Sequence, residues 1–217
     1  MVDARLAGDM ATWQLIESAG NTLVRIIKNH VDAVLPLAGV SVQLATTKLF
    51  DSLVTTSKPT ITVFLYRVME HSELRNAPRR VLPDGATTRP LLPLELCYLI
   101  TPWGVRRDDT PLADSQAAQE EYRLLGVVLQ ALYDHSEISR AELVEDPTRP
   151  VWEPSDSAQL ILESLPVEDH YRIWDASELA YRLSVTYRMR VVGLEPSRRD
   201  RAAPVVEAEL PHRVGVP

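Results

Sequence analysis

The chain holds few residues that could carry covalent or metal chemistry. Its only cysteine, Cys97, lies among apolar neighbours, whereas a nucleophilic thiol needs a lowered pKa and an access path, so we expect a small buried core residue. The five histidines are isolated along the sequence, which favours a structural or surface role for each. They are His30, His71, His135, His170 and His212. No cluster of Cys and His has the spacing of a zinc site, so we expect no metal and no cofactor.

The spacings that define common enzyme sites do not occur in the sequence. It has no G-x-G-x-x-G or G-x-x-x-x-G-K-[ST] loop, no H-E-x-x-H and no G-x-S-x-G, and only 8 glycines in 217 residues. The carboxylate pairs Glu120–Glu121 and Glu168–Asp169 belong to expected helices, where adjacent positions do not point to one site, and we expect them to be solvated. We predict that the chain is not an enzyme. The alternative is a small-molecule-binding domain or an enzyme whose site is assembled from residues far apart in the sequence.

Arginines form the candidate interface. Of the 23 basic residues only Lys28, Lys48 and Lys58 are lysines, and arginine suits planar contacts across protein interfaces. Two groups stand out: Arg182, Arg188 and Arg190 on the outer face of the last expected strand, and Arg79, Arg80 and Arg89 in a proline-rich loop. Each group has two interpretations, a solvated surface or a docking surface for an acidic protein.

Net charge and hydropathy limit the partners and the compartment. The net charge of −7 argues against nucleic acid as the main partner, because that partner requires a basic face. The start of the chain has no apolar run typical of a signal peptide, and no stretch approaches the ~20 apolar residues of a membrane helix. With one cysteine and no internal disulfide, these features predict a cytoplasmic protein without a membrane partner.

The positioning elements follow from hydrophobic periodicity. We expect a helix from Asp9, which is the predicted N-cap, with Trp13, Ile16, Gly20, Leu23 and Ile27 on its apolar stripe. A short strand over 40–44 and a strand over 60–68 with two apolar faces come next. Residues 77–93 carry four prolines and predict a long loop. A strand over 94–101 is then expected to stop at Pro102.

The second half of the chain has the same mixture of elements. We expect a largely buried helix over 114–134, a connector with Pro147, Pro150 and Pro154, a strand over 158–165, a helix over 167–174 and a strand over 181–191. The fold class is α+β: a single domain with a mixed or antiparallel sheet flanked by helices, and long Pro-rich loops. Residues 9–194 form this domain, and residues 195–217 form a flexible tail. Within the tail, residues 204–208 could dock on a neighbour's sheet edge.

Four stretches together resemble the cap or tail-terminator proteins of phage-tail-like, extracellular-type contractile injection systems. They are T-I-T-V-F-L-Y-R-V-M-E-H-S-E-L-R-N at 60–76, L-P-L-E-L-C-Y-L-I-T-P-W at 92–103, E-Y-R-L-L-G-V-V-L-Q-A-L-Y-D-H at 121–135 and L-I-L-E-S-L-P at 160–166. Their order and spacing are similar to that family's N-terminal domain over roughly residues 10–194. Some relatives have a further C-terminal domain, which this sequence does not include.

The resemblance implies a structural protein. Members of this family are understood to form a ring, expected to be a hexamer, that ends the inner tube and anchors the last sheath ring. The implied partners are other copies of the chain, the inner tube protein and the sheath protein. Another tail-completion or baseplate adaptor of the same particle is the alternative. This interpretation predicts that charge reversal at Arg188 and Arg190 weakens docking and leaves the monomer folded.

Overall fold

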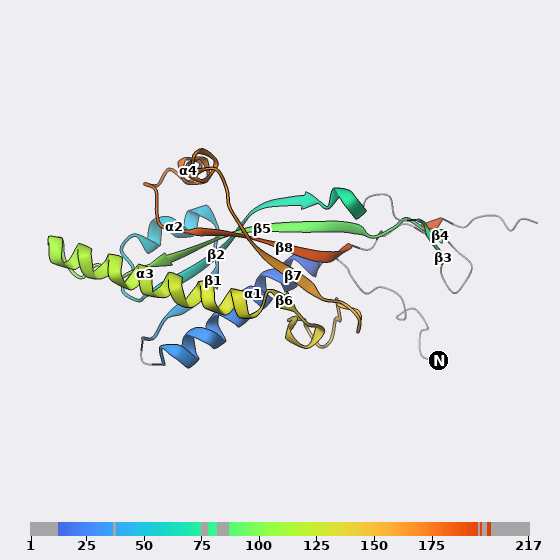
Figure 1. Cartoon of the computed structure of the whole chain (residues 1–217), viewed down its shortest axis with the longest axis horizontal. Coiled ribbons are helices and arrows are strands. Elements are labelled where there is room, and N and C mark those ends of the chain that lie inside the picture. Colours follow the sequence, from blue (N-terminus) through green and yellow to red (C-terminus); the bar gives the residue numbers. More distant parts are fainter. Residues whose placement is uncertain are drawn as a thin grey trace, which may run out of the picture.

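A mixed six-stranded sheet runs through the molecule in the order β1-β2-β5-β8-β7-β6 (Figure 1). The computed structural model describes residues 13–36, 38–74, 78–81, 87–194, 196 and 199–200. The strands are β1 (Ser41–Leu44), β2 (Thr60–Glu70), β5 (Leu92–Trp103), β6 (Glu137–Ile138), β7 (Ala158–Glu163) and β8 (Val185–Leu194). β1 pairs with β2 in parallel and every other pair in this sheet is antiparallel, which confirms the predicted α+β class.

Four helices cover the two faces of this sheet. They are α1 (Leu15–Val34), α2 (Thr47–Leu53), α3 (Pro111–Asp134) and α4 (Val167–Asp175). α1 and α3 lie on one side and α2 and α4 on the other (Figure 1). Two short 3₁₀ turns, Ser72–Leu74 and Arg140–Glu142, complete the helical elements of the described residues.

The main core lies between the sheet and the pair α1 and α3. Alternate residues of β5 supply its centre, because successive side chains of a strand point to opposite faces. Leu96, Tyr98 and Ile100 are almost completely buried there, in one core cluster with Leu23 and Ile27 of α1. The predicted stripe of α1 is wrong at its start, since Trp13 precedes the helix and is 71% exposed. The predicted N-cap, Asp9, lies outside the described residues.

A second, aromatic core lies under α2 and α4. Phe50 of α2 contacts Trp103 of β5 and Trp174 of α4, with ring centroids 5.5 Å apart in each pair. Helix α2 was not predicted, because its seven residues are too few for a periodic pattern to show. The predicted helix over 167–174 is confirmed as α4.

Three strands extend beyond their predicted bounds: β2 ends at Glu70, β5 spans Leu92–Trp103 and β8 ends at Leu194. β5 continues through Pro102 to Trp103, although proline was expected to stop it. Only β2 pairs with this last part of β5, since β8 pairs no further than Ile100, and a strand with one neighbour tolerates a residue without an N–H. β2 is buried on both faces only in its first half; in its second half Val68 is 45% exposed.

The predicted loop over 77–93 contains two short strands. β3 (Arg80–Val81) pairs with β4 (Thr87–Thr88), and β4 pairs with β9 (Arg199–Asp200). This small sheet lies beyond the end of β8 (Figure 1). β9 belongs to the stretch predicted as a flexible tail, and residues 201–217, including the predicted docking segment 204–208, lie outside the described residues.

Apart from Ala113, the buried residues of helix α3 lie in its C-terminal half, which corrects the prediction of a largely buried helix. Leu124, Val127, Val128, Ala131 and Leu132 pack into the main core. In the first half Leu112 and Tyr122 are 67% and 65% exposed. Figure 1 shows the reason, because this half extends beyond the sheet. No helix among the described residues is long and apolar enough to cross a membrane.

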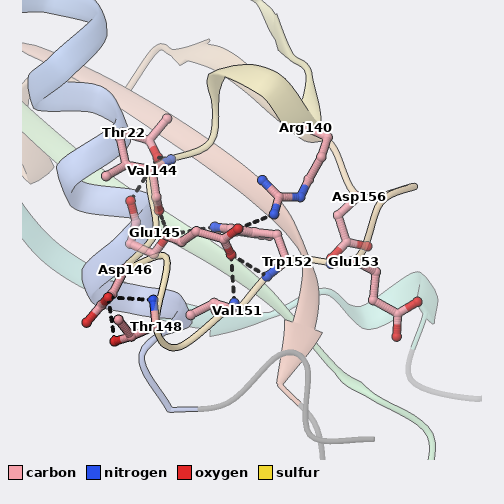
Figure 2. Close-up of polar contacts among 11 residues, drawn as sticks. Thr22, Arg140, Val144, Glu145, Asp146, Thr148, Val151, Trp152, Glu153 and Asp156 are labelled. Atoms are coloured by element: carbon pink, nitrogen blue, oxygen red, sulfur yellow. Dashed lines mark hydrogen bonds and ion pairs between the residues drawn. The ribbon is translucent and has the colours of Figure 1, made fainter. Parts of the chain in front are cut away.

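The carboxylate of Glu145 fixes the middle of the proline-rich connector between α3 and β7. Glu145 Oε2 accepts hydrogen bonds from the backbone N–H groups of Val151 (2.7 Å) and Trp152 (3.1 Å), and Glu145 also pairs with Arg140 (Figure 2). The indole of Trp152 then donates to Ser18 Oγ of α1 at 2.6 Å. The connector is therefore fixed against the first turns of α1.

Candidate interface

Two of the predicted interface arginines share one buried carboxylate. Glu95 of β5 accepts a hydrogen bond from Arg190 Nε at 2.9 Å and from Arg188 Nη1 at 3.2 Å. The strand register causes this meeting, because Cys97 lies opposite Arg188 and Glu95 opposite Arg190 on the same face of β5 and β8. The side chain of Glu95 is only 8% exposed, against 28% and 37% for the two arginines.

Further polar groups surround this pair. Glu163 Oε1 of β7 lies 3.9 Å from Arg188 Nε, and His71 Nε2 lies 3.7 Å from Glu95 Oε1. Burial alone would raise the pKa of Glu95, but hydrogen bonds from Arg188 and Arg190 outweigh it and hold the pKa below its ordinary value. Glu95 is therefore an anion at neutral pH, and much of the positive charge of this face is compensated within the chain.

Arg182 lies apart from the other two arginines of its group. The predicted strand over 181–191 begins only at Val185, so Arg182 precedes β8. Its guanidinium carbon lies 4.7 Å from the centre of the Trp103 ring, and its Nη1 lies 3.3 Å from Glu121 Oε1. Arg182 thus joins β5 to α3, and the sequence pattern placed it on the wrong element.

The arginines predicted in the proline-rich loop belong to the region of the small sheet formed by β3, β4 and β9. Arg79 and Arg89 are exposed and flank the β3–β4 hairpin. Of Arg80 the structure describes only the backbone, which pairs with Thr88. The structure therefore separates the six predicted residues into a compensated pair on the sheet, a link to α3 and a group beside the small sheet.

Comparison with known protein families identifies the family of this chain. Residues 18–208 match the model of the family described as the Pvc16 N-terminal domain. The chain belongs to this family. No curated protein matches it.

Two solved structures share the fold of this Pvc16 N-terminal domain. One is the sheath/tube terminator of the extracellular contractile injection system PVC in the extended state, with 18% identity, a TM-score of 0.53 and 89% of this chain covered. The other is the tube-terminating cap of the anti-feeding prophage, with 20% identity, a TM-score of 0.57 and 88% covered. The chain spans 64% and 59% of those two proteins.

In this Pvc16 N-terminal domain, the cysteine and two of the histidines considered as candidate catalytic residues lie in the core or next to groups of their own fold. Cys97 is buried in the middle of β5, where burial raises the pKa of its thiol. His135 Nδ1 lies 2.7 Å from the carbonyl oxygen of Ala131, and His170 Nε2 lies 2.8 Å from Ser184 Oγ. His212 lies outside the described residues. Within the described part of the chain, no three His, Cys, Asp or Glu side chains gather as a metal site would require.

The adjacent carboxylates of α3 are not solvated, which corrects the prediction for them. Glu120 Oε2 accepts from the backbone N–H of Val105 at 2.8 Å, and Glu121 Oε1 accepts from Gly104 at 3.3 Å. They fasten the projecting half of α3 to the end of β5. The second pair, Glu168 and Asp169 on α4, is exposed as predicted.

A groove of about 330 Å³ beside α1 is relevant to the small-molecule alternative. Its lining includes Trp13, Glu17, Glu145 and Asp146. Glu145 bonds the backbone of its own connector, and Asp146 Oδ1 accepts from the backbone N–H of Thr148 at 2.8 Å. These carboxylates are engaged in local structure, so they do not favour a binding site for a small molecule.

Proposed function

We propose that this chain is the cap, or tail terminator, of a contractile phage-tail-like injection particle. In this role copies of the chain form a ring, expected to be a hexamer, that ends the inner tube and anchors the last sheath ring. Its partners are other copies of itself, the tube protein and the sheath protein, and it joins the particle from the cytoplasm. The role involves no catalytic step, cofactor, membrane or nucleic acid.

One observation carries the proposal: two terminator proteins share this fold over 88–89% of the chain. The match to the Pvc16 N-terminal domain over residues 18–208 supports the same assignment. The chain spans 64% and 59% of the two terminator proteins, so the role of a whole terminator is part of the proposal.

The shape of the molecule suits a terminator. A ring subunit contacts a neighbour on each side and the tube or sheath as well, so it needs several separate surfaces. The chain extends past its central sheet at two ends, with the first half of α3 at one and the β3–β4–β9 sheet at the other (Figure 1). Arg79 and Arg89 flank the second of these ends and supply charge for an acidic partner.

Affinity purification of a tagged copy from the native host tests the proposal. We expect mass spectrometry to identify tube and sheath proteins in the eluate, and negative-stain imaging to show rods with the tag at the end distal to the baseplate. A matched control carries the same tag on an abundant unrelated cytoplasmic protein.

Two results would contradict the proposal. Recovery of the bait alone or with metabolic enzymes would contradict the proposal that the chain is a component of an injection particle. A tag at the baseplate end would instead support the alternative, a tail-completion or baseplate adaptor.

A further inference from the structure

The outer edge of β7 is open beyond its first residues. β6 pairs only with Ala158 and Gln159, whereas β7 continues to Glu163 along β8. The N–H of Leu160 donates to the carbonyl of Ser136 at 2.8 Å, so the polar backbone groups of Leu160 face outward. Those of Leu162 face the same way, because the pattern repeats every second residue. Among the described residues no strand pairs with this edge at Leu162, which leaves a template for an added strand.

An apolar groove lies directly beside this open edge. It has a volume of about 380 Å³ and runs between the C-terminal half of α3 and strands β7 and β8. Its apolar lining consists of Leu129, Leu132, Tyr133, Leu160, Leu162 and Tyr187. Tyr133 is 81% exposed and Leu162 is 54% exposed. These large apolar side chains therefore face solvent next to the unpaired backbone of β7. Such an arrangement suits an extended apolar segment that pairs with the edge and buries alternate side chains.

We propose that residues 203–208 of a neighbouring copy add to the open edge of β7 as a further strand. The proposal rests on the ring proposed above and names one of its subunit contacts. The segment reads A-P-V-V-E-A, with two adjacent valines, so one valine faces the groove and the other faces away in either register. Pro204 suits this position because proline is confined to edge strands and strand starts.

Chain length assigns the segment to another copy. Leu162 pairs with Tyr187, and from Tyr187 to the end of β8 at Leu194 the strand rises about 23 Å. β9, which ends at Asp200, lies farther out in the same direction (Figure 1). Five residues span at most about 17 Å, so Val205 cannot return from Asp200 to Leu162 of its own chain. A contact from the tail of one copy to the β7 edge of the next is head-to-tail, which is the type that closes a ring.

Disulfide trapping in assembled particles tests this contact. Two copies with different tags are expressed together, one carrying Leu162→Cys and the other carrying Val205→Cys or Val206→Cys. The native Cys97 is buried and stays in place. We expect mild oxidation to give a covalent pair with both tags for at least one of the two tail variants. Leu44→Cys on β1 is the matched control, since Leu44 is 42% exposed on the strand at the other edge of the sheet, and with it we expect the pair to be lost.

Each other outcome overturns the inference. No bridge through Leu162→Cys, a bridge only within one chain, or pairs of two Leu162→Cys copies would each exclude residues 203–208 of a neighbour at β7. A bridge through Leu44→Cys would transfer the contact to β1. If the tags still mark the end of the particles, only the strand contact fails. If the chain is absent from the particles, the proposed function fails and the contact that rests on it fails as well.

Discussion

On strand β5, the carboxylate of Glu95 lies between the guanidinium groups of Arg188 and Arg190. Its side chain is nearly buried, and each of its oxygens accepts from a different arginine. A buried anion is tolerated only when such partners replace the water that it lost. Glu95 therefore holds the two arginines in place, and they in turn keep it ionised.

Glu95→Gln is expected to destabilise the fold. The variant keeps the size of the side chain but leaves two partly exposed arginines without their anion. We expect a loss of about 1–2 kcal/mol in the free energy of unfolding, below the range for fully buried pairs because both arginines retain water. Urea unfolding at neutral pH measures it. Glu168→Gln on the exposed surface of α4 is the control, and equal losses in the two variants would contradict a special role for Glu95.

The same pair predicts a pH dependence. Because the folded state lowers the pKa of Glu95, its contribution to stability is present in full above the ordinary carboxyl pKa of 4.5. The contribution is lost as the pH falls from that value towards the lowered pKa. We therefore expect wild type and Glu95→Gln to differ most at neutral pH and to converge in acid. A difference that stays constant from pH 7 to pH 3 would exclude the charge as its cause.

Pairing with Glu95 also changes the expected result of charge reversal. Glutamates in place of Arg188 and Arg190 would gather like charges around Glu95 and Glu163, so we expect the double reversal to destabilise the monomer as well as any docking. Calorimetry of the isolated chain measures this. An unchanged melting temperature would contradict this and would favour the first prediction, in which the reversal leaves the fold intact.

At the scale of the element, the projecting half of α3 depends on one close backbone approach. A Cβ on Gly104 would lie 2.4 Å from the carbonyl oxygen of Ala117, so Gly104→Ala must displace the helix. We expect a loss of about 1–3 kcal/mol of stability. Gly126→Ala, in the same helix with open space around it, is expected to gain about 0.5–1 kcal/mol. Thermal unfolding compares the two, and equal effects would contradict the contact.

The connector before β7 gives a second test at this scale. Glu145→Ala removes the acceptor of the backbone N–H groups of Val151 and Trp152 (Figure 2). We expect faster hydrogen exchange at these two amides, by about tenfold for a net loss of about 1.4 kcal/mol per site. Protection in the strands should change less. Asp109→Ala, at an exposed position ahead of α3, is the control; unaltered exchange at Val151 would show that Glu145 does not hold the connector.

At the scale of the whole molecule, the arginines beside the small sheet remain the predicted charged docking group. Arg89→Glu changes an exposed residue, so the free energy of unfolding of the monomer should change by less than about 0.5 kcal/mol. Under the proposed function, we expect less of the variant in purified particles, with a stronger loss at low salt, where surface charges are least screened. Arg149→Glu, on the connector, is the control. Normal incorporation of Arg89→Glu would remove this group from the interface.

Local patterns in the sequence determined much of the fold. Alternation over 181–191 indicated the core face of β8, the apolar stretch over 94–101 indicated the strand β5, and the apolar period over 114–134 indicated the helix α3. These predictions succeeded because a strand or helix that packs on one side must repeat its apolar residues at the period of the element. The same periodicity also found α4 and the short strand β1.

Only the tertiary structure decided which of these residues meet. Arg188 and Arg190 lie more than ninety positions from Glu95, and nothing in the local pattern around β8 indicates that partner. The exposed half of α3, the length of β5 beyond Pro102 and the open edge of β7 depend on where a neighbouring element ends. Periodicity reports which face of an element is apolar, whereas pairing, coverage and open edges are set by contacts between segments far apart in the chain, and these form only when the whole chain folds.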